Sequence, residues 1–204
     1  MNTMPQTTPT LTQQILVVKR DTMFKNQEAW HGISIDNLQT TLSVIAEHQE
    51  SMARNLAELD PSYKQIVSYM IFTFDSKIFV MQRKNQASEQ KLANKLSIGI
   101  GGHMTQQDIQ GETLFDWIHR EFDEEVSYTG NLAMHTLGIL NDDSNEVGQR
   151  HIAIVVLLQG DNGDITLNGD EHKSGQLLSM EECFERFDEF ENWSKLVLQA
   201  LVAE

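Results

Sequence analysis

The run from Arg120 to Glu125 (REFDEE) holds the residues of this chain that are best suited to do chemistry. On a helix, Glu121, Glu124 and Glu125 stand at i, i+3 and i+4, which stacks their carboxylates on one face. Like charges so placed repel one another, so an isolated helix is more stable without them. A hard divalent cation removes this repulsion, and Mg²⁺ and Mn²⁺ prefer oxygen ligands. The spacing therefore predicts a metal site and, with it, chemistry on phosphates.

A helix over 113–126 is expected to hold these carboxylates. Its apolar side chains share one arc, beside the arc of the glutamates, and can anchor it to a sheet: Leu114, Phe115, Ile118, Phe122 and Val126. Arg120 lies beyond the acidic arc, where a bidentate contact can orient a glutamate. We therefore expect a rigid site at the edge of the contact between the helix and the sheet.

Strands and helices are expected to alternate along the rest of the chain. Short apolar runs predict strands at 15–19, 66–74, 77–82, 96–100, 132–140, 150–159 and 164–167. Helical spacing predicts a helix over 38–59 that stops before Pro61, and Ser179 with Glu182 fits a capping box that starts another. A last helix has one apolar stripe: Trp193, Leu196, Val197, Ala200 and Leu201. These elements predict an α/β (α+β) fold with a mixed sheet.

Composition and charge narrow the classes of function. The chain has 204 residues and a net charge of −15, and it shows no basic footprint of the kind that binds nucleic acid. Its longest apolar run, 152–158, is far shorter than the roughly 20 residues of a membrane helix. Residues 1–14 read as a flexible tail, and the single Cys183 suits a reducing cytoplasm. We expect a cytoplasmic protein without nucleic-acid or membrane partners.

The acidic segment resembles the Nudix box, the signature of hydrolases that act on a nucleoside diphosphate linked to another group. The family pattern is Gly, five residues, Glu, seven residues, and then Arg-Glu-apolar-any-Glu-Glu-any-Gly-apolar. Glu112, seven further residues and the 120–125 run match it without a gap. The resemblance implies a Nudix-type α/β/α sandwich over 61–204, with 15–60 as an N-terminal extension packed on it.

Two departures from the family pattern leave every carboxylate in place. Gly102 stands where the box glycine belongs, but nine residues separate it from Glu112, which predicts a four-residue insertion within 103–110. Ser127 replaces the late glycine, and Tyr128 follows at the apolar position. The insertion is therefore expected to reshape the loop near the site.

A narrower resemblance involves two further segments. The phrase at 96–104 (LSIGIGGHM), followed by 141–145 (NDDSN), is similar to a group of bacterial Nudix proteins described only as predicted phosphoesterases. This match implies no particular substrate, because specificity lies in pocket loops that vary between relatives.

The resemblance implies roles for the matching positions. Glu124 and Glu125 are the implied ligands of Mg²⁺ or Mn²⁺, and Glu112 completes the shell directly or through water. Glu121 is either a ligand or the base for the attacking water. Arg120 holds glutamates in place. The implied catalytic set is Glu121, Glu124 and Arg120, and the implied substrate is a small nucleotide or diphosphate.

Further ligands are expected outside the box. The family often takes one more acid from another strand or loop, and Glu171 is the candidate metal ligand; its competitors are Asp142, Asp143 and Glu146. For substrate, Gly101 and Gly102 let the backbone approach closely. Arg83 ends a predicted strand and Arg150 starts one, where either side chain can contact phosphate or be solvated.

Two alternatives stand beside the hydrolase. The first is a Nudix-fold module that binds or senses a nucleotide without cleaving it, although such a module has no need of all four box carboxylates. The second is an isomerase of the same fold that handles an isoprenoid diphosphate, but its catalytic cysteine would stand in a different place from Cys183. Residues 15–60 have three candidate roles: completing the pocket, forming a homodimer, or packing as a lid.

Overall fold

The protein is described by a computed structural model that covers residues 13–83, 94–109, 113–169 and 172–202. Its strands are β1 (Gln14–Lys19), β2 (Gly32–Ser34), β3 (Glu50–Ala53), β4 (Tyr63–Phe74), β5 (Lys77–Arg83), β6 (Leu96–Ser97), β7 (Val126–Ser127), β8 (Leu132–Asn141), β9 (His151–Gly160), β10 (Thr166–Leu167) and β11 (His172–Ser179). Its α-helices are α1 (Arg20–Met23), α2 (Leu38–His48), α3 (Arg54–Ala57), α4 (Leu114–Glu125), α5 (Glu146–Arg150), α6 (Met180–Glu185) and α7 (Asn192–Leu201).

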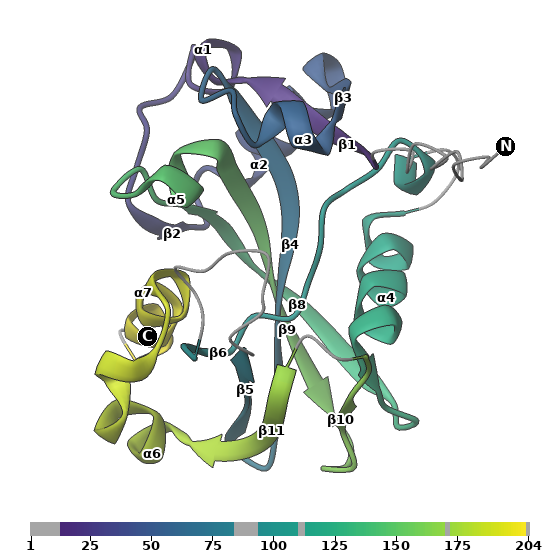
Figure 1. Cartoon of the computed structure of the whole chain (residues 1–204), viewed down its shortest axis with the longest axis vertical. Coiled ribbons are helices and arrows are strands. Elements are labelled where there is room, and N and C mark those ends of the chain that lie inside the picture. The colour runs from purple at the N-terminus through teal and green to yellow at the C-terminus, as the bar shows by residue number, and fades with distance from the viewer. Residues whose placement is uncertain (1–12, 84–93, 110–112, 170–171, 203–204) are drawn as a thin grey trace, which may run out of the picture.

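A mixed sheet forms the middle layer, with the main path β11-β5-β4-β9-β8-β2. The central strands β4 and β9 run parallel over nine residue pairs, from Gln65↔His151 to Thr73↔Gln159, and their other neighbours are antiparallel. In Figure 1, α4 lies on one side of this sheet, and α6 and α7 lie on the other. The α/β/α sandwich predicted from the sequence is confirmed.

Two apolar clusters hold the layers together, one on each face of the sheet. Ile66, Met70 and Phe72 of β4 face α4, whereas the intervening Val67, Tyr69 and Ile71 face α6 and α7. This alternation follows from the two-residue period of a strand, and both faces are apolar because both are covered.

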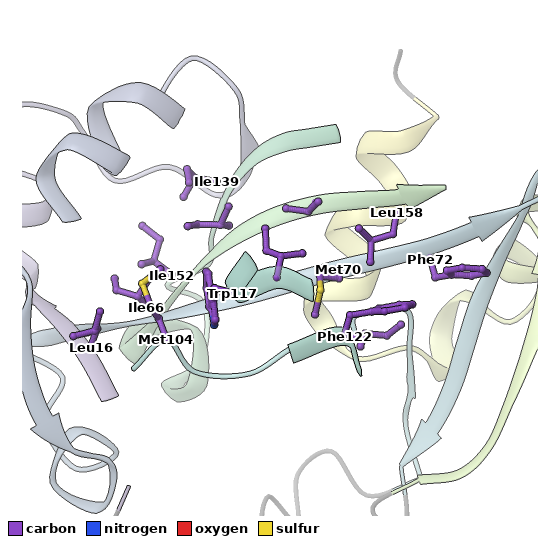
Figure 2. Close-up of a cluster of buried hydrophobic side chains, with 14 of the residues drawn as sticks. Leu16, Ile66, Met70, Phe72, Met104, Trp117, Phe122, Ile139, Ile152 and Leu158 are labelled. Carbon is purple, nitrogen blue, oxygen red and sulfur yellow. The ribbon is translucent and has the colours of Figure 1, made fainter. Parts of the chain in front are cut away.

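Helix α4 is anchored by large side chains that point into the sheet. Figure 2 shows Trp117 and Phe122 among the side chains of β4, β9 and the run that leads to Met104. Trp117 is fully buried, and the Phe122 ring stacks on Phe72 with centroids 6.1 Å apart. The helix is thus held in one orientation, and the polar face beside this contact is fixed with it.

The run from Gly99 to Met104 is inserted along one edge of β4. On that edge β4 pairs with β1 near Tyr63, then with this run through Val67↔His103 and Met70↔Ile100, and then with β5. The run continues to β1, where the Leu16 amide donates to the Met104 carbonyl at 2.7 Å. An extended glycine-rich segment therefore fills the space beside β4 between β1 and β5.

The helix predicted over 38–59 is wrong in its second half. Helix α2 ends at His48, and β3 follows at once and pairs with β1 from Val17↔Glu50 to Gln14↔Ala53. Leu56 and Leu59, which extended the helical spacing, are 58% and 79% exposed and form no buried stripe. A long-range strand pairing has overridden the local pattern.

Other predicted elements are confirmed or extended. The hairpin turn at Asp75-Ser76 has φ values of 48° and 60°, and Ser179 caps α6 in a capping box with Glu182. Strand β11 lay outside the prediction; it pairs with β5 at the end of the sheet. Among the described residues, no helix is long and apolar enough to cross a membrane.

Candidate active site

Helix α4 begins at a capping box immediately before the acidic run. The Thr113 amide donates to the Asp116 carboxylate at 2.8 Å, and the Asp116 amide donates to Thr113 Oγ1 at 3.3 Å. Two amide groups left unpaired by the first helical turn are thereby satisfied. This cap fixes where the helix starts and so fixes the angular positions of the glutamates that follow. Glu112 lies outside the described residues.

The three glutamates of the acidic run differ in exposure although all line one cavity. Glu121 is 7% exposed, Glu125 is half-buried and Glu124 is exposed. Burial raises the pKa of Glu121, and the charge and hydrogen bond of Arg120 work in the opposite direction. A buried carboxylate next to a second acid is stabilised by a cation. Glu121 is therefore the carboxylate whose ionised form depends most on a positive neighbour.

Arg120 binds two of these glutamates at once. Its Nη2 donates to Glu121 Oε1 and its Nη1 donates to Glu124 Oε1, both at 2.8 Å. The planar guanidinium presents its donors in a fixed fork, so the two carboxylates are held in a defined relation to each other. The structure thus brings Arg120, Glu121 and Glu124 together in one network.

Asp108 completes this network and was missed by the sequence analysis. Arg120 Nε donates to Asp108 Oδ1 at 2.9 Å, and the opposite carboxylate oxygen accepts from the Thr105 amide and from Thr105 Oγ1, each at 2.7 Å. Asp108 is 3% exposed and belongs to the segment in which the insertion was predicted. The Thr-x-x-Asp spacing is typical of a local side-chain turn and was the only sequence signal of its place.

Gly101 and Gly102 allow the backbone to approach this network closely. A Cβ atom on Gly102 would stand 2.0 Å from Glu121 Oε2, and one on Gly101 would stand 2.2 Å from the Ser68 carbonyl oxygen. Any larger residue at 102 would displace the Glu121 carboxylate or the strand. The two predicted substrate-binding glycines therefore lie at the cavity wall, next to the buried acid.

The cavity has a volume of about 700 Å³ and is open to solvent on one side. Helix α7 forms part of the opposite wall through Asn192 and Trp193. It is tied to the glycine-rich run because the Ile98 amide donates to Ser194 Oγ at 3.0 Å, and the Tyr69 hydroxyl lies 2.8 Å from the same oxygen. The cavity is thus lined by the glycine-rich run, α4 and α7.

Two histidines meet in the wall of this cavity. His103 Nε2 lies 3.3 Å from His151 Nε2 and 2.8 Å from Gln65 Oε1, and His151 Nδ1 lies 2.7 Å from the Val147 carbonyl oxygen. Burial, with the neighbouring charges of Arg54 and His151, lowers the pKa of His103 to about 3. Both histidines line the cavity, and neither had been predicted to have a role in it.

The remaining predicted residues lie elsewhere. Glu171 is outside the described residues, and Arg83 is described only as the last residue of β5. Arg150 is the last residue of α5. It is not among the described residues that line the cavity, whereas the next residue, His151, lines it. The competing acids of the polar turn have structural partners: Asp142 accepts from Ser144 and Asn192, and Asp143 pairs with Lys64 and Arg20. Glu146 begins α5.

Comparison with known proteins agrees with this geometry. No protein-family model matches the chain. It is 31% identical over 202 residues to Protein YmaB of Bacillus subtilis (strain 168), an alignment that covers 93% of this chain and 97% of YmaB. The crystal structure of Tm1382, described as a putative Nudix hydrolase, superposes with a TM-score of 0.77 at 25% identity and covers 94% of this chain and 99% of that one.

A more distant structure shares the fold alone. DR0079 from Deinococcus radiodurans superposes with a TM-score of 0.57 at 16% identity, covering 85% of this chain and 98% of that one. The relatives, the α/β/α sandwich and the acidic helix beside its glycine-rich run point to one conclusion. The chain belongs to the Nudix superfamily and is a Nudix-type pyrophosphohydrolase.

Proposed function

We propose that the protein hydrolyses a phosphoanhydride bond in a nucleoside diphosphate linked to another group, with Mg²⁺ or Mn²⁺ as cofactor. One observation supports this proposal above all: Glu121, Glu124 and Glu125 line one cavity while Arg120 binds two of them. This arrangement keeps carboxylates together that would otherwise repel one another.

The side chains at the site fit a hard divalent cation. Their donor atoms are carboxylate oxygens, which suit Mg²⁺ and Mn²⁺. In the network of Arg120, Asp108, Glu121 and Glu124 the single guanidinium faces three carboxylates, so negative charge remains after pairing. Glu125 adds another acid to the same cavity. We propose Glu121, Glu124 and Glu125 as ligands, with Glu112 as a further one.

Each residue then has a defined part in catalysis. When bound, a divalent cation neutralises the charge of the pyrophosphate and acidifies a water molecule for in-line attack. Glu121 would hold the cation or accept a proton from the attacking water, and its burial suits either role. Arg120 keeps Glu121 and Glu124 in position. Gly102 lets the substrate approach the backbone beside Glu121.

The cavity supports a substrate of nucleotide size. Its volume of about 700 Å³ lies within the range of typical ligand pockets. Arg54 and Lys95 line it and are better placed than Arg150 to meet phosphate oxygens. Trp193 offers an aromatic side chain for contact with a base. Hydrolysis of the phosphoanhydride bond in a small nucleoside diphosphate derivative is therefore the proposed reaction class.

The context of the reaction is also a proposal. The single cysteine and the acidic composition support a cytoplasmic enzyme that uses small molecules as partners.

We also propose that residues 15–60 form an extension of a Nudix domain over 61–204. Strand β1 links the two because it pairs with β4. A homodimer is tested by measuring the mass of the full chain in solution by light scattering.

A substrate panel tests the proposed activity. The full chain is incubated with nucleoside diphosphate derivatives, including sugar, nucleoside and alcohol conjugates, in Mg²⁺ or Mn²⁺, and products are separated by ion-exchange chromatography. We expect one class to be cleaved and Glu125→Gln to abolish turnover with an unchanged far-UV circular dichroism spectrum. Tight binding of a nucleotide without turnover would instead favour the sensor module, and unchanged turnover in the variant would refute the role of the box.

A further inference from the structure

Two histidines and one glutamate from distant parts of the chain converge beside the substrate cavity. Glu58 follows α3, His103 belongs to the glycine-rich run and His151 begins β9. One ligand atom of each lies within 4.8 Å of the others. His103 follows the box glycine Gly102, but none of the three is one of the Arg or Glu positions that define the Nudix box, so the cluster is distinct from the glutamates of α4.

The spacing of the two imidazoles fits coordination to one metal ion. Zn–N bonds of about 2.0–2.1 Å at a tetrahedral angle separate two nitrogens by about 3.3–3.4 Å. His103 Nε2 and His151 Nε2 are 3.3 Å apart. Two imidazole nitrogens at this distance need a proton or a cation between them, because their lone pairs otherwise repel. Because the observed and the required distances agree, the two nitrogens need not move to bind one metal ion.

The surroundings of His151 fix the tautomer that a metal ligand requires. His151 Nδ1 donates to the Val147 carbonyl oxygen at 2.7 Å, which leaves the Nε2 lone pair of the neutral ring directed at His103. Metal-binding histidines are commonly held in this way by a backbone carbonyl. The His151 ring thus presents Nε2 toward His103, as a shared metal ion would require.

Two neighbours compete with a metal ion at this cluster. Without an ion, the Nε2 proton of His103 is satisfied by Gln65 Oε1 at 2.8 Å, so metal binding must move that proton to Nδ1. The other half of this amide, Gln65 Nε2, is buried and makes no hydrogen bond within the described residues. Arg54 Nε lies 3.7 Å from Glu58 Oε1 and must share that carboxylate.

We propose that Glu58, His103 and His151 form a second metal site, which takes a transition-metal ion such as Zn²⁺ or Co²⁺. Imidazole nitrogens suit these ions, whereas the carboxylates of α4 suit Mg²⁺ and Mn²⁺. One cavity is thus bordered by two sites of different metal preference. The inference does not rest on the proposed hydrolysis, since it concerns metal binding by residues other than the box glutamates.

Cobalt absorption tests the site directly. The metal-stripped full chain is titrated with Co²⁺, whose visible absorption reports nitrogen coordination. We expect the nitrogen-coordinated absorption to saturate with one equivalent, and His103→Asn to weaken this binding by more than about tenfold. Glu58→Gln, at a partly exposed position, weakens binding without threatening the core. Arg54→Gln tightens it, because the competing cation is removed.

Two controls separate this site from the others. His135→Asn removes an exposed histidine of β8, and Glu124→Gln alters the Nudix box; both should keep the cobalt spectrum. Melting curves by circular dichroism establish that each variant is folded. Absence of the spectrum in the wild type, or its loss in Glu124→Gln with retention in His103→Asn, would overturn the proposal.

Discussion

Replacing Asp108 by Asn should loosen the network that holds the Nudix glutamates without removing any of them. Asp108 is buried, and each of its two carboxylate oxygens has a different partner: Oδ1 accepts from Arg120 and Oδ2 accepts from Thr105. Asn has one acceptor oxygen, so its NH₂ group must face donors on one of the two sides. Either the guanidinium or the turn at Thr105 then loses its partner.

The magnitude follows from the kind of hydrogen bond that is lost. Hydrogen bonds to a charged group contribute about 1.5–3 kcal/mol, so the free energy of unfolding should fall by about 2–3 kcal/mol. Arg120 would still reach Glu121 and Glu124, but its own position would no longer be fixed. Loss of a supporting partner behind metal ligands typically costs about 10–100-fold in affinity or activity. We expect this loss mainly as a lower kcat and as a higher Mg²⁺ concentration at half-maximal activity.

Urea unfolding and steady-state hydrolysis with a Mg²⁺ titration measure the two effects separately. Asp188→Asn is the matched control, because Asp188 is fully exposed and loses the same charge. It should match the wild type in both assays. If Asp108→Asn had wild-type kcat and Mg²⁺ midpoint, the reasoning that Asp108 positions the glutamates through Arg120 would be refuted.

Three further changes probe other contacts. Gly102→Ala places a Cβ atom 2.0 Å from Glu121 Oε2 and should lower kcat by about a hundredfold with the fold retained, as steady-state rates and circular dichroism would test. Burial would raise the pKa of Asp143, but hydrogen bonds from its two cationic partners hold it at about 2. This folded-state pKa lies below the unfolded value, so the ionised Asp143 stabilises the fold above about pH 4. About 2 kcal/mol of the free energy of unfolding is lost as the pH falls toward 2. Asp143→Asn should remove this pH dependence in urea unfolding. Ser194→Ala leaves the buried Ile98 amide without its acceptor and should lower the free energy of unfolding by about 1–3 kcal/mol in the same assay.

The sequence predicted the elements that depend on local patterns. Helix α4 was predictable because its cap, apolar arc and acidic arc lie within one segment, and the hairpin at Asp75-Ser76 carries its own turn signal. The apolar residues of 66–74 predicted a strand, but the central position of β4, with both faces covered, depends on packing against α4 on one side and α6 and α7 on the other.

The parts that were missed depend on contacts between distant segments. Nothing local to Asp108 shows that it meets Arg120, since the contact requires the segment that carries Asp108 to fold back on α4. The approach of His103 to His151 likewise requires the glycine-rich run to pair with β4 beside β9. The predicted helix over 38–59 is interrupted by β3 because β1 offered a strand partner, and it resumes only as the four residues of α3.

The dependence of turnover on Mg²⁺, compared between the wild type and Glu121→Gln, tests the central claim most directly. Glu121 is the buried acid that contacts Arg120 and lies against Gly102. With the substrate found in the panel, the wild type should show saturable activation by Mg²⁺, and the variant should show no turnover at any Mg²⁺ concentration while melting like the wild type. Equal activation curves for the two proteins would contradict the account.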